Sequence, residues 1–121
     1  MSYRPAQCNI GRRQRYWRAA LACVSFLVAV GIVVAYAVGA LPGLLLIGVF
    51  APLALAFEFG IQAYESFCVT LALLGKYDFA DESGRVTDPT NRRDDRRYAL
   101  RISAVSVALA ALLTVALVAF L

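Results

Sequence analysis

The sequence contains no histidine, and only 17% of its 121 residues are charged. Without an imidazole, Ser-His and Cys-His catalysis are excluded and the usual zinc and haem ligand sets are disfavoured. The sequence also lacks a phosphate loop, a dinucleotide fingerprint and a lipidation motif. We therefore expect no metal site, no cofactor, no catalytic residue and no nucleic-acid partner, and an enzymatic role is disfavoured.

Charge is also missing from three long stretches of the chain. Residues 19–40, 41–57 and 102–121 carry no charged side chain. A helix needs roughly 20 apolar residues to cross about 30 Å of hydrocarbon, and these runs lack the alternation of membrane barrel strands. The pattern predicts an all-α integral membrane protein with three transmembrane helices, namely a tight helical hairpin and a third helix.

The charged residues divide the chain into four segments. We expect a basic cytoplasmic N-terminal segment at 1–18, a helical hairpin at 19–75 with its turn at 41–43, a charged cytoplasmic loop at 76–97 and a third span at 98–121. The second helix, from 44 to 75, would be about 48 Å long, so its end should extend into the cytoplasm. A kink is expected at Pro52, and Asp88-Pro89 resembles a helix N-cap, so the third helix begins near Pro89.

All 12 lysines and arginines lie before residue 19 or between residues 76 and 101. The positive-inside rule therefore predicts a cytoplasmic N-terminus and an external C-terminus. We expect the membrane to be a bacterial or archaeal plasma or inner membrane. Four arginines form an interfacial anchor, for which specific binding of anionic lipid is the competing interpretation: Arg12, Arg13, Arg15 and Arg18. A signal peptide ending near residues 35–37 is disfavoured, because the apolar run is long and a second span follows at once.

Three polar residues are predicted to share one face of the second helix. Glu58, Gln62 and Glu65 have the spacing i, i+4, i+7. Glu58 would lie about 9 Å inside the apolar region, where an ionised carboxylate costs several kcal/mol unless it is paired or protonated. We favour a structural role, in which Glu58 pairs with Arg15 or Arg18 or forms hydrogen bonds between helices, over a proton or ion path that uses Glu58 and Glu65.

Small residues recur at helical spacing on the third helix, where they predict a packing face: Ser103, Ser106, Ala110 and Thr114. Three helices alone are too few to shield this face and the polar face of the second helix. The leading hypothesis is therefore a small non-enzymatic membrane protein that acts through helix-helix association, as a homo-oligomer or an accessory subunit of a membrane complex. Its expected partners are the lipid bilayer and either itself or another membrane protein.

The three cysteines differ in their predicted positions. Cys23 lies within the first span, where cysteine behaves as a small apolar residue. The hairpin should return Cys8 and Cys68 to the same cytoplasmic side, where a static disulfide is disfavoured. A reactive pair that handles thiols or sulfur is the alternative function, against two unrelated free thiols.

Part of the chain also resembles a known family. The residues that carry the resemblance are Cys8-Asn9-Ile10-Gly11, the arginines that follow, and Phe67-Cys68-Val69 after the second span. Over residues 8–75 the pattern resembles the YgaP-like inner-membrane helical hairpin domain. In that family two antiparallel helices form a small membrane unit, often homodimeric, and some members carry a rhodanese domain that handles sulfane sulfur. The resemblance implies a hairpin that presents thiols or docks a sulfur-transfer partner, although this chain has no rhodanese domain and adds a loop and a third helix.

Overall fold

The computed structural model describes residues 3–79 and 82–121, and it is mostly helical. Three helical segments within these residues are long and apolar enough to cross a membrane: α1 (Arg12–Ala37), the segment Gly43–Glu65, and α5 (Pro89–Phe120). The prediction of an all-α membrane protein with a hairpin and a third helix is thereby confirmed.

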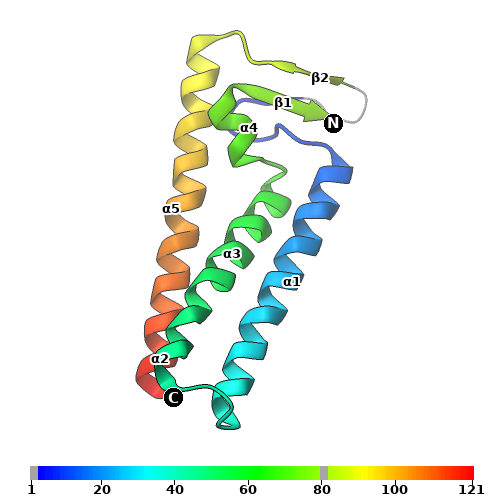
Figure 1. Ribbon diagram of the computed structural model, residues 1–121. Helices are drawn as coiled ribbons and strands as arrows, with labels where there is room; N and C mark the ends of the chain where they lie inside the picture. The colour runs from blue at the N-terminus through cyan, green and yellow to red at the C-terminus, as the bar shows by residue number, and fades with distance from the viewer. Residues whose placement is uncertain (1–2, 80–81) are drawn as a thin grey trace.

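The three spans lie side by side, with α3 (Phe50–Glu65) between α1 and α5 (Figure 1). In the half of the molecule near the hairpin turn, α3 and the turn before it pack against both neighbours. Ala29 of α1, Val49, Leu53 and Ala110 of α5 form one buried cluster there. Closer to the polar end, a methyl group added at Gly60 would lie only 3.9 Å from Ala22 Cβ. The hairpin therefore closes on small side chains, as membrane helices commonly do.

The second span is not one uniform helix. It starts with a single α-turn, α2 (Gly43–Leu46), and continues through a 3-10 turn, η1 (Ile47–Val49), into α3. Pro52 has no N–H to donate, and its ring crowds the carbonyl four residues earlier. The distortion expected from Pro52 is thus present as a tighter turn just before α3.

The second span also ends earlier than predicted. α3 stops at Glu65, because Ser66 adopts a left-handed conformation with φ 56° and ψ 42°. A separate short helix, α4 (Val69–Leu74), follows and ends at Gly75, which is again left-handed with φ 69°. The predicted continuous helix from 44 to 75 is therefore wrong, and the chain turns at the end of the apolar region.

The charged segment after α4 contains a β-hairpin that the sequence analysis treated as loop. β1 (Lys76–Phe79) pairs antiparallel with β2 (Glu82–Arg85), with Lys76 opposite Arg85. Asp81, one of the acids of this segment, lies outside the described residues. Asp88 then caps α5, since its Oδ1 accepts a hydrogen bond of 2.8 Å from the Thr90 N–H. The predicted start of the third helix at Pro89 is confirmed.

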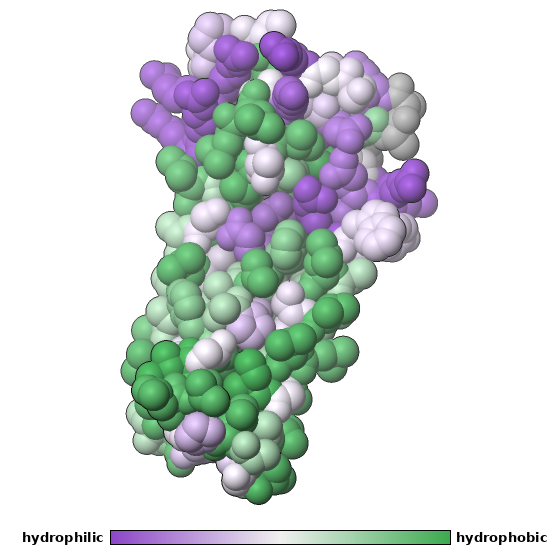
Figure 2. Space-filling model, viewed as in Figure 1, coloured by the Kyte–Doolittle hydropathy of each residue, from purple (hydrophilic) through white to green (hydrophobic). Residues whose placement is uncertain are grey.

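The residues before α1 complete a polar head at one end of the molecule. We define the polar head as residues 3–11, 66–79 and 82–97. The N-terminal segment joins β1 here, since the Gly11 N–H donates to the Asp78 carbonyl and the Asp78 N–H donates to the Asn9 carbonyl, at 3.2 and 2.9 Å. Figure 2 shows hydrophilic residues gathered at this end and hydrophobic residues over the opposite half. This separation is what a membrane protein requires, while its orientation stays a prediction.

Candidate functional site

A buried asparagine ties the N-terminal segment to the end of the hairpin. The Asn9 side chain donates through Nδ2 to the Cys68 carbonyl at 3.1 Å and accepts through Oδ1 from the Cys68 N–H at 2.6 Å. The Asn9 N–H also donates to the Ser66 carbonyl at 3.1 Å. Asn9 is fully buried, so these bonds satisfy backbone groups that water does not reach. We call this arrangement the Asn9 clasp.

The clasp holds Cys68 where its sulfur meets two N–H donors. Arg18 Nη2 lies 2.7 Å from Cys68 Sγ, and the Leu71 N–H lies 3.5 Å from the same sulfur. Cys68 is the N-cap residue of α4, so its sulfur occupies the position at which a helix start presents free N–H groups. In both contacts the sulfur is the hydrogen-bond acceptor, and Cys68 is only 3% exposed.

Cys8 lies on the other side of the clasp, next to Asn9 in the chain. Its Sγ is 3.7 Å from the Ile10 carbonyl oxygen, and the residue is partly exposed. Both Cys8 and Cys68 are free thiols, as is Cys23, which is exposed on α1 within the apolar part. The fold thus brings Cys8 and Cys68 to the same end of the molecule, although 59 residues separate the clasp partners, and leaves Cys23 apart.

A hydrogen-bonded chain of polar side chains crosses all three spans. Arg18 Nε of α1 donates to Gln62 Oε1 at 3.1 Å, and Gln62 Nε2 donates to Glu58 Oε1 at 3.1 Å. Ser103 Oγ of α5 donates to the same Glu58 oxygen at 2.9 Å. Of the two structural interpretations of Glu58, the structure shows the hydrogen bond between helices, since Ser103 of α5 donates to Glu58 and Gln62 lies between Glu58 and Arg18. We call Arg18, Gln62, Glu58 and Ser103 the three-helix network.

The other anchoring arginines divide into two groups. Arg15 Nε donates to the Ala63 carbonyl of α3 at 3.0 Å, so Arg15 faces the hairpin as Arg18 does. Arg18 is also fixed by Gln14, which accepts from its Nη1 at 3.0 Å and donates to the Asp78 carboxylate of β1. By contrast, Arg12 and Arg13 are exposed, and no hydrogen bond of their side chains occurs within the described residues.

Glu65, the last member of the predicted polar stripe, joins a different group. Glu65 lines a groove together with Tyr98 and Arg101 of α5. The Tyr98 ring packs edge-on against the buried Phe67 ring, with their centroids 4.7 Å apart. Glu58 is hydrogen-bonded to α5 through Ser103, and Glu65 lies beside α5, but no hydrogen bond among the described residues connects the two acids.

The small-residue face of α5 packs against other helices of the same chain. Ser106, Ala110 and Thr114 are buried, while Ser103 is partly buried beside Glu58. The Ser106 and Thr114 hydroxyls donate to carbonyls four residues earlier in α5, at 2.8 and 2.7 Å. This face and the polar face of α3 therefore shield parts of one another, which the sequence analysis did not anticipate.

Two residues that the sequence analysis did not single out organise the polar head. Asp95 is fully buried, and its carboxylate accepts hydrogen bonds from the Tyr3 hydroxyl and, at 2.7 Å, from the Ala6 N–H. Burial and the Asp95 carboxylate raise the pKa of Tyr3 above its usual value. No periodic pattern marks Tyr3 or Asp95, because each acts through contacts with a segment that is distant in the sequence.

Comparison with known proteins gives no match, since no family model, curated protein or solved structure is similar to this chain. The resemblance to the YgaP-like hairpin domain therefore stays a prediction. Among the described residues, no group of three or more cysteine, aspartate or glutamate side chains is placed to hold a metal ion. The chemistry that the geometry offers is that of two thiols, one arginine and a shielded hydrogen-bonded network.

Proposed function

We propose that this membrane protein handles thiols or sulfane sulfur through Cys8 and Cys68 at the polar end of its helices. The Asn9 clasp supports the proposal, because Asn9 binds the backbone of the arginine-bound Cys68 and directly follows the partly exposed Cys8 in the chain. Reactive cysteines lie in surroundings that are electropositive and partly exposed. Each of the two thiols has one of these properties. Cys8 supplies access to solvent, and Cys68 supplies the contact with a guanidinium.

The chemistry proceeds by two exchanges at sulfur and needs only a persulfide as co-reactant. The Cys8 thiolate attacks the terminal sulfur of a persulfide RS–SH, RS⁻ leaves, and Cys8 carries the sulfur as Cys8–S–SH. The Cys68 thiolate then attacks the Cys8 sulfur, and hydrosulfide leaves. The two cysteines are thereby oxidised to a disulfide, and the sulfane sulfur is reduced to HS⁻. In the structure the two sulfurs contact other groups, so bond formation requires both side chains to rotate.

Treatment of the reconstituted full chain with glutathione persulfide tests this proposal. Mass spectrometry of the wild type should show a Cys8–Cys68 disulfide that a thiol reductant reverses, whereas Cys68→Ser should retain one added sulfur on Cys8. Cys23→Ala is the matched control, because Cys23 lies within the apolar region, and it should behave as the wild type. Sulfur addition spread equally over all three cysteines, or no addition to Cys8, would overturn the proposal.

Arg18 gives a second test of the same site. Arg18→Gln keeps a side chain that hydrogen-bonds but removes the charge beside Cys68, so disulfide formation from Cys8–S–SH should slow. Persulfide formation on Cys8 should keep its wild-type rate. A variant that changed both rates equally would indicate a general loss of structure, and unchanged rates in both steps would refute the role of Arg18.

A second candidate function is lateral association, as a homo-oligomer or an accessory subunit. The observation that favours it is the exposure of α1. Ala29 is the one buried residue of α1, whereas α5 has six buried residues. α1 packs against α3 on one side and leaves its other side uncovered (Figure 1). Oxidative cross-linking through the exposed Cys23 in Cys8→Ser/Cys68→Ser protein should give a dimer band if α1 faces a second copy. A band that disappears on dilution with lipid would refute stable association.

A proton or ion path through Glu58 and Glu65 is the weakest of the three candidates. Glu58 already has two hydrogen-bond donors within the chain, and no hydrogen bond among the described residues links it to Glu65. Flux into proteoliposomes that is abolished by Glu58→Gln would restore this candidate, and flux equal to that of empty vesicles would eliminate it.

A further inference from the structure

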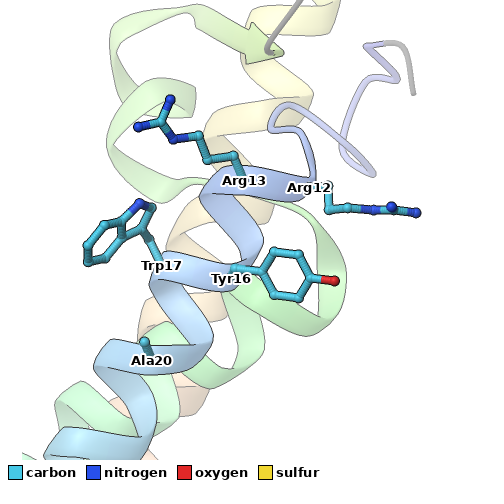
Figure 3. Close-up of a pocket in the computed structure, with 5 residues that line it drawn as sticks. All are labelled: Arg12, Arg13, Tyr16, Trp17 and Ala20. Atoms are coloured by element: carbon cyan, nitrogen blue, oxygen red, sulfur yellow. The ribbon is translucent and has the colours of Figure 1, made fainter.

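The exposed arginines at the start of α1 border a groove that none of the thiol chemistry uses. Its lining residues are Arg12, Arg13, Tyr16, Trp17 and Ala20, and its volume is about 570 Å³. Figure 3 shows Arg13 and Trp17 projecting to one side of α1, Arg12 and Tyr16 to the other, and Ala20 one turn further along the helix. We call this feature the collar groove.

The side chains of the collar groove change in character along the helix axis. Arg12 and Arg13 lie at its polar end, and Tyr16 and Trp17 follow one turn later with 68% and 62% of their surface exposed. Ala20 provides a small side chain where the charge-free stretch of α1 begins. A turn of helix rises about 5.4 Å, so the cations lie one step outside the aromatic rings. This order matches a phospholipid, whose phosphate lies outside the interfacial layer that tyrosine and tryptophan prefer.

The arginines of the groove are also free to bind an external anion. Arg15 and Arg18 face α3 and are hydrogen-bonded there, whereas the Arg12 and Arg13 side chains make no hydrogen bond within the described residues. One acid, Asp78, lines an adjoining groove with Arg13, and its carboxylate accepts a hydrogen bond from Gln14. Two guanidinium groups thus face solvent, and each is able to bind phosphate oxygens in a bidentate manner.

We propose that the collar groove is a binding site for the headgroup of an anionic phospholipid. The Arg12 and Arg13 side chains project to opposite sides of α1, so both turn toward the space between Tyr16 and Trp17 to bind the phosphate, and the upper part of the acyl chain lies between the two rings over Ala20. An arginine that only fixes orientation needs no such groove and no lipid preference, so the site goes beyond the positive-inside rule. It is also independent of the proposed thiol chemistry, since Cys8 and Cys68 do not line it.

Trp17 is the only tryptophan of the chain, so its fluorescence reports directly on this groove. The full chain is reconstituted in phosphatidylcholine vesicles that contain the same small fraction of either brominated phosphatidylglycerol or brominated phosphatidylcholine. Both leaflets have the same composition, so the result does not depend on orientation. We expect the brominated anionic lipid to quench Trp17 more strongly, with an apparent preference of about fivefold for each arginine. Equal quenching by the two lipids would overturn the proposal.

Matched charge variants separate a site from a general attraction. R12Q/R13Q should abolish the preference, whereas R96Q/R97Q removes the same charge from exposed positions on α5 and should keep it. Equal losses in the two variants would show that only the overall charge matters and would refute the site. R12K/R13K retains charge without the planar fork, and we expect it to keep part of the preference.

A competition experiment identifies the source of the phosphate. Addition of inorganic phosphate to wild-type vesicles should leave the quenching ratio unchanged beyond the effect of equal ionic strength from chloride. A specific loss of the preference with phosphate would identify a free anion as the ligand and would refute the lipid assignment. Unquenched Trp17 emission in pure phosphatidylcholine should match between variants, which shows that α1 remains intact.

Discussion

Removal of the Asn9 side chain tests the feature on which the polar head depends. Asn9→Ala deletes both side-chain hydrogen bonds to the Cys68 backbone. The N–H and the carbonyl of Cys68 then lack these partners. Both groups are buried, so water does not replace the lost bonds unless the segment opens. The variant should therefore separate the N-terminal segment from α4 without touching the membrane-spanning part of the helices.

The expected size of the effect follows from these two bonds. A hydrogen bond between neutral groups contributes about 1 kcal/mol net, and a buried group left without a partner costs more. We take about 2 kcal/mol as the minimum loss, which corresponds to a roughly 30-fold larger population of the open segment. Cys68 is only 3% exposed when the clasp is closed, so its reactivity should report this population.

The assay is alkylation of Cys68 by a small maleimide in Cys8→Ser/Cys23→Ala protein, in which Cys68 is the sole thiol. Asn9→Ala should accelerate labelling about 30-fold relative to this background. Gln7→Ala is the matched control, because Gln7 is exposed on the same segment, and it should leave the rate unchanged. If Asn9→Ala and Gln7→Ala label Cys68 at the same rate, the clasp does not stabilise the head and the reasoning is refuted.

Three further predictions concern the spans and the head. Gln62→Leu removes the bridge between Arg18 and Glu58, so it should lower the free energy of unfolding in mixed detergent by about 1–3 kcal/mol. Tyr64→Leu, on the exposed side of α3, is the control and should change this free energy little. Ala110→Leu should cost about 1–3 kcal/mol in the same assay because Ala110 is fully buried, and a comparable loss in the exposed Ala108→Leu would contradict the packing described. Burial and the carboxylate beside it raise the pKa of Tyr3, so its neutral form stabilises the head fully below about pH 10, and this contribution is lost as the pH rises further. The protection of the head amides, corrected for base-catalysed intrinsic exchange, should therefore fall in alkali in the wild type, and Tyr3→Phe should lack this fall.

The fold class was accessible from the sequence because its signal is additive along the chain. Three uncharged stretches predict three helices, because every backbone N–H and C=O group in lipid must be hydrogen-bonded within the protein. The start of α5 was equally local, since Asp88 and Pro89 are adjacent in sequence. The end of α3 was not predicted, because the left-handed turn at Ser66 occurs between two apolar segments that continue the helical pattern.

The candidate site was only partly accessible from the sequence. Helical spacing predicted that Glu58 and Gln62 share a face, and they are hydrogen-bonded to one another. The choice of Gln62 as the bridge to Arg18, and of Ser103 as the donor from α5, depends on how three helices are placed side by side. Spacing within one helix carries no information on that placement.

The sequence by itself determined that this protein has three membrane helices, where its charges concentrate and which residues have polar or thiol side chains. Only the tertiary structure decided that Asn9 holds Cys68, that Arg18 contacts its sulfur, and that Arg12 and Arg13 remain exposed. The reason is physical. Burial of an apolar run depends on its own composition, whereas a hydrogen bond between residues 9 and 68 depends on the distance and direction that the intervening hairpin imposes.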